Sequence, residues 1–279
     1  MAIYEVKNGE GIIPEGTTVI ERGAFKDCED LKCLIIPEGV TSIRDGAFEG
    51  CKNLESITIP ASAKKIECAW NLFKDCTALK SIVVAEGNPS YDSRGGCNAI
   101  IETESNTLVF GCATTIIPED VTEIASKAFF RCKNLTSITI PASVTTIGYY
   151  AFQDCTSLTS VTILGDLTEI CEEAFHGCEN LTSVTISGSV AVIEEDAFAA
   201  CSLTEITLPK GVTKIKANAF ASNKLRKVTL PAGIKTIDKY AFVRNDIETI
   251  YVPAKKGDYY KKRLDASLHD KIVELEPEK

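Results

Sequence analysis

Several residue types are scarce in this sequence. Among 279 residues there are two histidines, one tryptophan and one methionine. No apolar run approaches the roughly 20 residues of a membrane-spanning helix. The 18 glycines follow no three-residue period, which excludes collagen. Hydrophobic residues make up 44% and charged residues 25%, which is typical of a folded globular protein and excludes a disordered chain.

Residues that carry chemistry are also missing at usable spacings. The histidines, His176 and His269, form no His-x-x-x-His pair, and no Cys-x-x-Cys occurs, so a zinc site lacks ligands. There is no Walker A sequence, no Gly-x-Gly-x-x-Gly and no Gly-x-Ser-x-Gly. A dyad of Cys178 and His176 is conceivable, but Cys178 belongs to a repeated column. We therefore predict no catalytic residues, no metal and no cofactor, and a protein that is not an enzyme.

The charge is unevenly distributed along the chain. The net charge of −9 argues against a nucleic-acid partner. Residues 1–208 carry 14 basic and 30 acidic side chains, whereas residues 209–263 carry 14 basic and 4 acidic ones. The basic stretch either solvates exposed positions or forms a patch for an anionic partner.

A column of phenylalanines shows an internal repeat. Most of them are 22–25 positions apart, and alanine precedes all but one. The column consists of Phe25, Phe48, Phe73, Phe129, Phe152, Phe175, Phe198, Phe220 and Phe242. Three residues after each of them stands a second column, made of Cys28, Cys51, Cys76, Cys132, Cys155, Cys178, Cys201, Asn223 and Asn245.

Each unit is built like residues 132–152, CKNLTSITIPASVTTIGYYAF. The stretch Leu135–Ile140 alternates as a strand does, and Pro141 ends it. A unit of this length cannot bury its own apolar face, so neighbouring units must stack into a solenoid with one continuous core. We predict a single domain over 1–279, divided into an N-terminal cap at 1–12, about ten repeats at 13–253 and a C-terminal cap at 254–279.

The combined pattern resembles the BspA-type (Treponema pallidum-type) leucine-rich repeat family over residues 12–253. The shared elements are Leu-x-x-Ile-x-Ile after a Cys or Asn, then Ile-Pro, Val-Thr-x-Ile and Ala-Phe-x-x-Cys. The resemblance implies a repeat solenoid of the α/β horseshoe kind, with a parallel β-sheet on the concave side. Short turns, 3-10 turns or helical pieces would form the rest. Members are commonly surface proteins of bacteria or protozoa that act in adhesion and protein binding.

The resemblance also explains the cysteine column. In leucine-rich repeats this position holds Asn or Cys, whose polar atom satisfies backbone groups in the turn. Asn223 and Asn245 replace Cys in the last two units, as interchangeable structural parts would. We expect structural buried thiols; metal or redox chemistry is the alternative.

Two departures from the repeat carry further expectations. Residues 66–73, IECAWNLF, are two residues longer than the norm and contain the only tryptophan, Trp70. This side chain either fills a local bulge or anchors a partner. The unit at 85–117 is ten residues longer than its neighbours. Its β-prone runs Ala99–Glu102 and Thr107–Phe110 predict a hairpin inserted within 88–112.

The inserted hairpin has two interpretations. The family resemblance implies a structural variant of the scaffold, and a binding protrusion is the second interpretation. If the strands pair around Glu104-Ser105, Cys97 falls opposite Cys112. Either a disulfide or two free thiols is then expected, depending on the redox compartment.

The C-terminal segment is expected to close the solenoid, because an open last unit exposes its core. Residues Ala254–Ser267 suit a short helix, with Tyr260 and Leu264 on one face. A strand is expected to follow at Ile272–Leu275.

Outward positions of the predicted strands form two ladders. The first contains Ser56, Ser81, Ser137, Ser160, Ser183, Glu205, Lys227 and Thr249, and the second contains Thr58, Val83, Thr139, Thr162, Thr185, Thr207, Thr229 and Tyr251. Solubility and strand propensity explain such ladders, and a hydroxyl-rich binding face is the alternative. The candidate binding residues are Ser137, Thr139, Ser160, Thr162, Ser183, Thr185, Thr207, Lys227, Thr229 and Tyr251. We favour the end with Lys227 and Tyr251, which offers charge and an aromatic anchor.

We predict a non-enzymatic binding module, a cell-surface adhesin-like protein that contacts a protein or glycan. Extracellular host molecules are among the partners considered. The alternative is an intracellular interaction scaffold. Family habit favours the surface. The start MAIYEVKNGEG lacks the basic and apolar segments of a signal peptide, which favours the cytoplasm unless an export signal lies outside this chain. We expect no nucleic-acid partner, no membrane span and a monomer.

Overall fold

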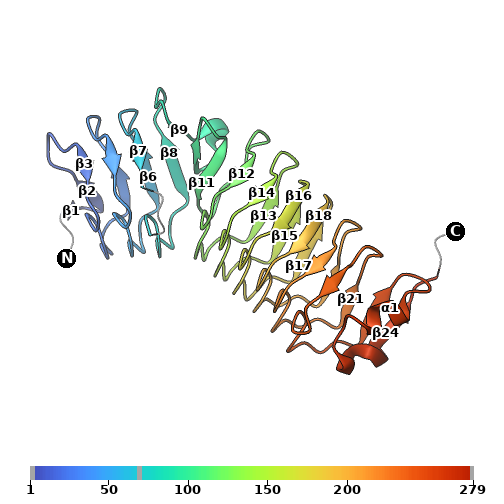
Figure 1. The fold of residues 1–279 in the computed structure, drawn as a ribbon. Helices are drawn as coiled ribbons and strands as arrows, with labels where there is room; N and C mark the ends of the chain where they lie inside the picture. The colour runs from blue at the N-terminus through green and yellow to red at the C-terminus, as the bar shows by residue number, and fades with distance from the viewer. Residues whose placement is uncertain (1–3, 68–70, 277–279) are drawn as a thin grey trace.

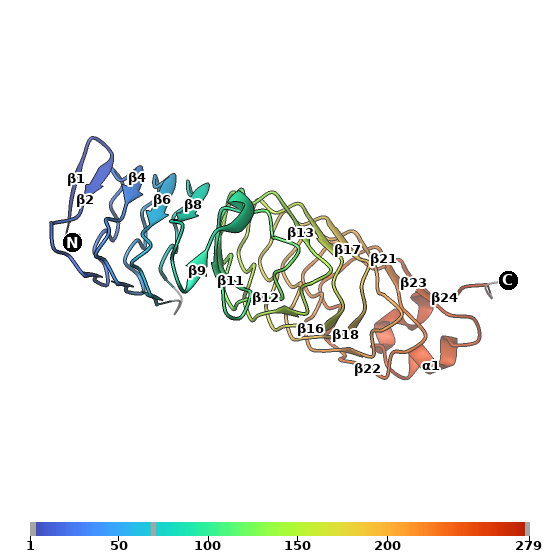
Figure 2. The same cartoon turned by 90° about the horizontal axis from the view of Figure 1, so that it is seen from above.

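The computed structural model describes residues 4–67 and 71–276 and shows a curved parallel β-solenoid of about eleven turns (Figure 1). Each turn contributes short strands to two rows, which run along opposite sides of the solenoid (Figure 2). Trp70 lies outside the described residues, so its two interpretations stay open.

The first row follows the Leu-x-x-Ile-x-Ile runs, as predicted. Its strands are β2 (Glu10–Ile12), β4 (Cys33–Ile35), β6 (Ser56–Ile59), β8 (Ser81–Val84), β13 (Ser137–Ile140), β15 (Ser160–Ile163), β17 (Ser183–Ile186), β19 (Glu205–Thr207), β21 (Lys227–Thr229), β23 (Thr249–Val252) and β24 (Ile272–Glu274). The row is divided into three hydrogen-bonded sheets. The first runs from β2 to β8, the second from β13 to β17 and the third from β19 to β24. Within each sheet these strands pair in parallel.

The return path of each turn also forms strands, where turns or helical pieces were expected. Its strands are β3 (Val19–Ile20), β5 (Ser42–Ile43), β7 (Lys65–Ile66), β12 (Glu123–Ile124), β14 (Thr146–Ile147), β16 (Leu167–Ile170), β18 (Val190–Ile193), β20 (Lys214–Ile215) and β22 (Thr236–Ile237). The Val-Thr-x-Ile runs are β-branched, and such residues favour extended backbone over helix. The described chain is therefore a solenoid with two strand rows and little helix.

The phenylalanine column forms the centre of the core. From Phe129 to Phe242 consecutive rings stack with centroids 4.7–5.5 Å apart. Phe25, Phe48 and Phe73 form a second stack at 5.5–6.0 Å. The buried side chains form two clusters, one on each side of the inserted hairpin, and not the one continuous core that we expected.

The hairpin itself divides the core. It consists of β10 (Ala99–Glu102) and β11 (Thr107–Gly111), which agrees with the predicted runs. Because successive side chains of a strand point to opposite faces, Ile100 packs into the N-terminal cluster and Ile101 into the C-terminal one. Phe110 meets Phe73 edge to face at 5.5 Å. The hairpin is thus part of the scaffold and replaces one turn of the stack.

The two cysteines that flank the hairpin are not bonded to each other. Cys97 belongs to the C-terminal cluster and Cys112 to the N-terminal one, and both are free thiols. The Cys112 thiol donates to the carbonyl oxygen of Asn98 at 3.3 Å. The disulfide considered from the sequence is therefore absent, because the two side chains enter different clusters.

Seven members of the Cys/Asn column, from Cys51 to Asn245, tie their turn to the one before it. The Cys155 and Cys178 thiols donate to the carbonyl oxygens of Phe129 and Phe152 at 3.1 and 3.2 Å. Asn223 makes the same bond to Phe198 at 2.7 Å, and its side-chain oxygen also accepts from the backbone of Leu203. The structural interpretation of the column is confirmed.

The Ala-Phe turns need left-handed backbone on both sides of the phenylalanine. The residue two positions after Phe is Gly50, Gly177 or a non-glycine such as Ala200, with φ of 77°, 70° and 56°. Side chains with a Cβ adopt this region at a cost of roughly 1–2 kcal/mol. Ala200 is therefore a locally strained position.

Short elements lie at both ends of the solenoid. Strand β1 (Glu5–Lys7) pairs antiparallel with β2. At the other end, α1 (Gly257–Lys261) and a 3-10 turn, Ala266–Lys271, precede β24, which pairs with β23. Tyr260 is fully buried and Leu264 nearly so. The Glu274 carboxylate accepts from the backbone of Gly257 at 2.8 Å, which joins the helix to the last strand.

Candidate functional site

The Ser and Thr ladders form two straight columns on β13, β15 and β17. Ser137, Ser160 and Ser183 are register partners. Thr139, Thr162 and Thr185 form the second column in the same way. All six side chains are exposed or half-exposed, while the alternate residues of β13 and β15 are buried. The structure thus presents these six candidates together on one surface, which we call the hydroxyl face.

The hydroxyls of this face are free to bind. A neighbouring column behaves differently, because Thr159 and Thr182 each donate to the backbone of the preceding turn, at 3.0 and 3.3 Å. Among the described residues, the six hydroxyls of the hydroxyl face have no hydrogen bond to protein. Each therefore keeps a donor and acceptor for water or a ligand.

A break separates the hydroxyl face from the remaining candidates. The segment Cys201–Leu203 has one residue between Cys and Leu, whereas Cys178–Leu181 has two. β17 and β19 consequently belong to different sheets, and a groove of about 480 Å³ lies between them. Val184 and Ile186, whose counterparts on β15 are buried, are half-exposed and line this groove.

The other four candidates form a second surface on β19, β21 and β23. Thr207, Thr229 and Tyr251 are register partners, and Lys227 lies beside them, opposite Thr249. Lys227 is exposed, whereas Tyr251 is half-buried. The structure therefore brings the ten predicted residues together as two surfaces of six and four residues.

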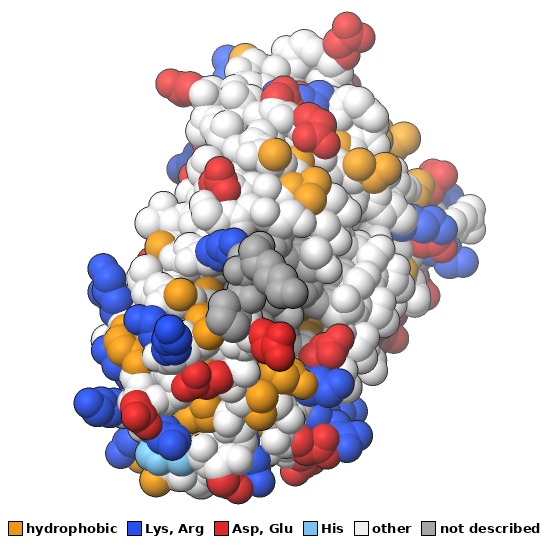
Figure 3. Space-filling view, turned by 90° about the vertical axis from the view of Figure 1, so that its right-hand side faces the viewer, with side chains coloured by type: hydrophobic (Ala, Val, Ile, Leu, Met, Phe, Trp, Pro, Cys, Tyr) orange, Lys and Arg blue, Asp and Glu red, His pale blue; other side chains and the backbone are white. Residues whose placement is uncertain are grey.

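The basic C-terminal stretch surrounds the last turns and does not form one face. Lys216 pairs with Glu194 at 2.6 Å, and Arg226 pairs with Glu248. The Arg263 guanidinium lies 3.5 Å from the ring centroid of Tyr259. Figure 3 views this end and shows Lys and Arg side chains interspersed with Asp and Glu. Part of the local positive charge is thus neutralised within the fold.

Buried thiols and polar groups serve the fold. Burial raises the pKa of the Cys132 thiol to about 12. The Cys178 thiol donates to backbone, and Nδ1 of His176 is buried without a hydrogen-bond partner, so the conceivable dyad does not form. In the described ranges no three His, Cys, Asp or Glu residues could hold a metal. No helix among the described residues is long and apolar enough to cross a membrane.

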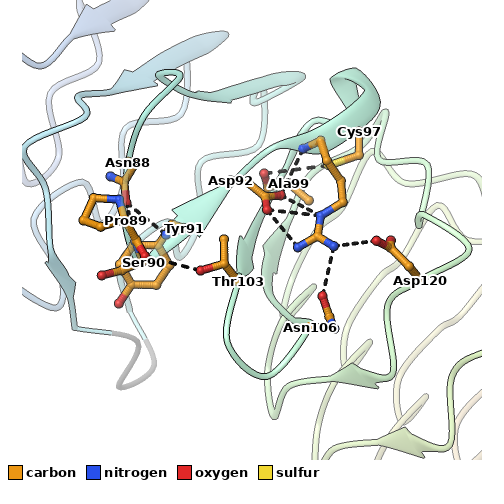
Figure 4. A network of polar contacts seen from close by, with 11 residues as sticks. Asn88, Pro89, Ser90, Tyr91, Asp92, Cys97, Ala99, Thr103, Asn106 and Asp120 are labelled. Carbon is orange, nitrogen blue, oxygen red and sulfur yellow. Dashed lines mark hydrogen bonds and ion pairs between the residues drawn. The ribbon is translucent and has the colours of Figure 1, made fainter.

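The inserted unit is held by a polar network (Figure 4). The Arg94 guanidinium contacts Asp92 at 2.8 Å, Asn106 at 2.9 Å and Asp120 at 2.5 Å. Asp92 and Asp120 raise the pKa of Arg94 above its usual value. Asn88 accepts from two backbone N–H groups at 2.9 Å. The Arg94–Asp120 pair joins the insert to the following segment, while the other bonds hold the insert itself together, which supports its scaffold role.

Sequence reasoning missed a group of exposed aliphatic residues on the first-row surface. Ile35 and Ile116 are 71% and 75% exposed, although both precede a buried isoleucine. The signal was present as a recurrent Ile-Ile-Pro-Glu, in which the first Ile occupies the outward position of the second ladder.

Together, the stacked turns, the Cys/Asn column and the short parallel strands define a leucine-rich-repeat solenoid, a class of protein that typically serves as a non-enzymatic binding scaffold. A family model described as the BspA type leucine rich repeat region matches residues 4–95, 111–222 and 152–263. The chain belongs to this family. No curated protein matches the sequence.

Solved structures with a similar fold are bacterial repeat proteins. A leucine-rich repeat protein from Eubacterium ventriosum shares 22% identity with a TM-score of 0.57, over 86% of this chain and 83% of that one. A leucine rich cell surface protein from Faecalibacterium prausnitzii shares 26% with a TM-score of 0.55, over 85% of this chain and 64% of that one. The pneumococcal vaccine antigen PcpA shares 19% with a TM-score of 0.65, over 89% and 69%.

Proposed function

We propose that this protein is a cell-surface binding module that holds a protein or glycan partner against its hydroxyl face. The observation that carries the proposal is the pair of in-register columns from Ser137 to Thr185, whose hydroxyls make no bonds within the described chain. The similarity to the Faecalibacterium cell surface protein supports the location.

The electrostatics of the hydroxyl face disfavour an anionic partner. Residues 134–209, which contain this face, include no Lys or Arg. A partner that met this face through its own acidic groups would be repelled by the surrounding carboxylates. The second surface, with Lys227 and Tyr251, supplies the cationic and aromatic contacts that the hydroxyl face lacks. An intracellular scaffold that uses the same surfaces is the second candidate.

Affinity capture with face-blocking variants tests the proposal. Thr162→Lys places a long charged side chain in the middle of the hydroxyl face. Thr146→Lys places the same side chain on an exposed position of β14, on the opposite row. Purified wild type and both variants are incubated with host serum, host matrix extract and lysate of the producing cell.

We expect a partner from serum or matrix that Thr162→Lys loses and Thr146→Lys keeps. A partner found only in the producer lysate would favour the scaffold. Equal capture by both variants would refute binding through the hydroxyl face. Loss of the partner at high salt would point to the second surface with Lys227.

A further inference from the structure

A row of exposed aliphatic side chains lies along the N-terminal half of the first-row surface. Ile12, Ile35 and Val83 are 42%, 71% and 43% exposed. The parallel pairing of β2, β4, β6 and β8 puts Ile35 opposite Thr58 and Thr58 opposite Val83, with Ile12 one strand before them. Large apolar side chains gathered in one line mark an interaction surface more strongly than scattered ones.

Ile116, which is 75% exposed, continues this row past the inserted hairpin. The segment that carries it lies beside β8, because the backbone of Ala113 donates to Leu79 and the Thr114 hydroxyl donates to Lys80. On its other side Ile116 lines a groove of about 250 Å³ with β13. The row therefore extends to the edge of the hydroxyl face.

An acidic column accompanies the aliphatic one. Each of the four aliphatic residues is followed three positions later by a glutamate, namely Glu15, Glu38, Glu86 and Glu119. The units with Thr in the same column have Ala, Gly or Lys at that position. Glu119 lines the same groove as Ile116. Glu38 accepts from the backbone of the next turn, but the other three are exposed and have no ion pair in the described chain.

The spacing of the row indicates the shape of its partner. Neighbouring strands are about 4.8 Å apart, so the row presents one branched side chain roughly every 5 Å, with Thr58 in place of an aliphatic residue between Ile35 and Val83. One turn of an α-helix rises about 5.4 Å and places one apolar side chain on a given face. An extended peptide repeats its same-face side chains only every 6.8 Å or so and would lose register within a few residues. A helix along the solenoid axis matches the row best.

We propose that this apolar–acidic stripe, formed by Ile12, Ile35, Val83, Ile116 and their flanking glutamates, binds a basic amphipathic helix of a protein partner. The apolar face of the helix covers the aliphatic row, and its Lys or Arg side chains pair with the free carboxylates. The stripe is a separate binding surface, on the opposite half of the solenoid from Lys227 and Tyr251. It does not depend on the function proposed for the hydroxyl face.

A designed peptide tests this inference on the full chain. The probe is a synthetic helix of about 15 residues, long enough to form in a groove, with Leu at i, i+3 or i+4, and i+7, and Lys on its flanks. A second peptide carries Glu in place of every Lys. Fluorescence anisotropy at low and high salt measures the affinity of the protein for each peptide. We expect the Lys peptide to bind and the Glu peptide not to bind. Equal affinity of the two peptides would overturn the charge argument.

Matched substitutions locate the binding site. Ile35→Thr and Ile116→Thr introduce the residue that Thr139 already supplies in the same column, so the fold is retained, and melting curves verify this. Each change should weaken binding by about tenfold, as expected when a buried branched side chain loses its apolar contact. The control is Val273→Thr, which changes a 46% exposed residue of the same column at the far end. An equal effect of the control and Ile35→Thr would refute the assignment.

Two further experiments test the role of the glutamates and the possibility of self-association. Replacing Glu15, Glu86 and Glu119 with Gln should reduce the salt dependence of peptide binding, because the screened attraction is then missing. Glu205→Gln, on β19, should leave it unchanged. Analytical ultracentrifugation of the protein alone tests whether a second copy of the chain occupies the stripe. A dimer that Ile35→Thr dissolves would overturn the helix proposal.

Discussion

Removing one ring from the middle of the phenylalanine column tests how strongly neighbouring turns depend on each other. Phe152 is fully buried, and its ring lies 4.7 Å from that of Phe129 and 4.9 Å from that of Phe175, nearly parallel to both. Phe25 is equally buried but lies near the N-terminal end. Its ring stacks on that of Phe48 at 6.0 Å and meets that of Tyr4 at a tilt, at 5.3 Å.

The expected magnitudes follow from these contacts. Replacing a buried Phe with Ala costs about 3–5 kcal/mol, depending on how far the site collapses. Each well-placed aromatic pair adds about 0.5–1.5 kcal/mol. Phe152 loses two close stacks inside a rigid run of turns, so Phe152→Ala should cost about 5 kcal/mol. Phe25→Ala should cost about 3 kcal/mol, because a terminal turn relaxes more easily.

Urea unfolding followed by circular dichroism measures both losses, and hydrogen exchange locates them. Because the inserted hairpin separates two buried clusters, each substitution should speed exchange mainly in its own cluster. An equal or greater loss for Phe25→Ala would refute the dependence on position in the stack. Exchange that rises equally in both clusters would refute the division at the hairpin.

Four further predictions concern single positions. Asn223→Cys should be tolerated, whereas Asn223→Ala should cost about 2 kcal/mol in urea unfolding, because buried backbone groups lose their partner. Ala200→Gly should raise the stability by about 0.5–1 kcal/mol by relieving the left-handed backbone, and a lower melting temperature would contradict this. Burial raises the pKa of the Cys155 thiol, so iodoacetamide in native buffer should label the half-exposed Cys33 first; equal labelling would contradict the burial argument. Two backbone N–H groups lower the pKa of Glu38 below 4.5, so its stabilisation is present above the unfolded-state pKa and is lost as pH falls through the folded one. Glu38→Gln should remove this part of the acid dependence of the melting temperature, and an unchanged pH profile would count against it.

Most of the fold was predictable from the repeat period. A 22–23-residue unit with a Phe and a Cys or Asn at constant spacing can bury its apolar residues only by stacking, and the structure confirms the solenoid. The role of the column was also predictable, because Asn223 and Cys155 are exchangeable only as hydrogen-bond donors. The hairpin strands followed from two β-prone runs, Ala99–Glu102 and Thr107–Phe110, the second of which extends one residue further in the structure.

The candidate surface was predictable in its members but not in its continuity. Strand alternation identifies outward positions, so the columns of Ser and Thr could be named from the sequence. The break between β17 and β19 could not, because it results from how one missing residue at Cys201–Leu203 shifts the next turn against its neighbour. The exposure of Ile35 and Ile116 was overlooked, because an isoleucine in a strand is ordinarily assigned to a core, although both stand at an outward position of the strand alternation.

The sequence by itself determined the period, the stack of turns and the identity of the inward column, because these depend on spacings within one unit. Only the tertiary structure decided which buried clusters form and where the rows of strands break into separate sheets. Cys97 and Cys112 illustrate the difference, since they flank the same hairpin but enter separate clusters. Those outcomes depend on contacts between turns, and no single unit of the sequence contains that information.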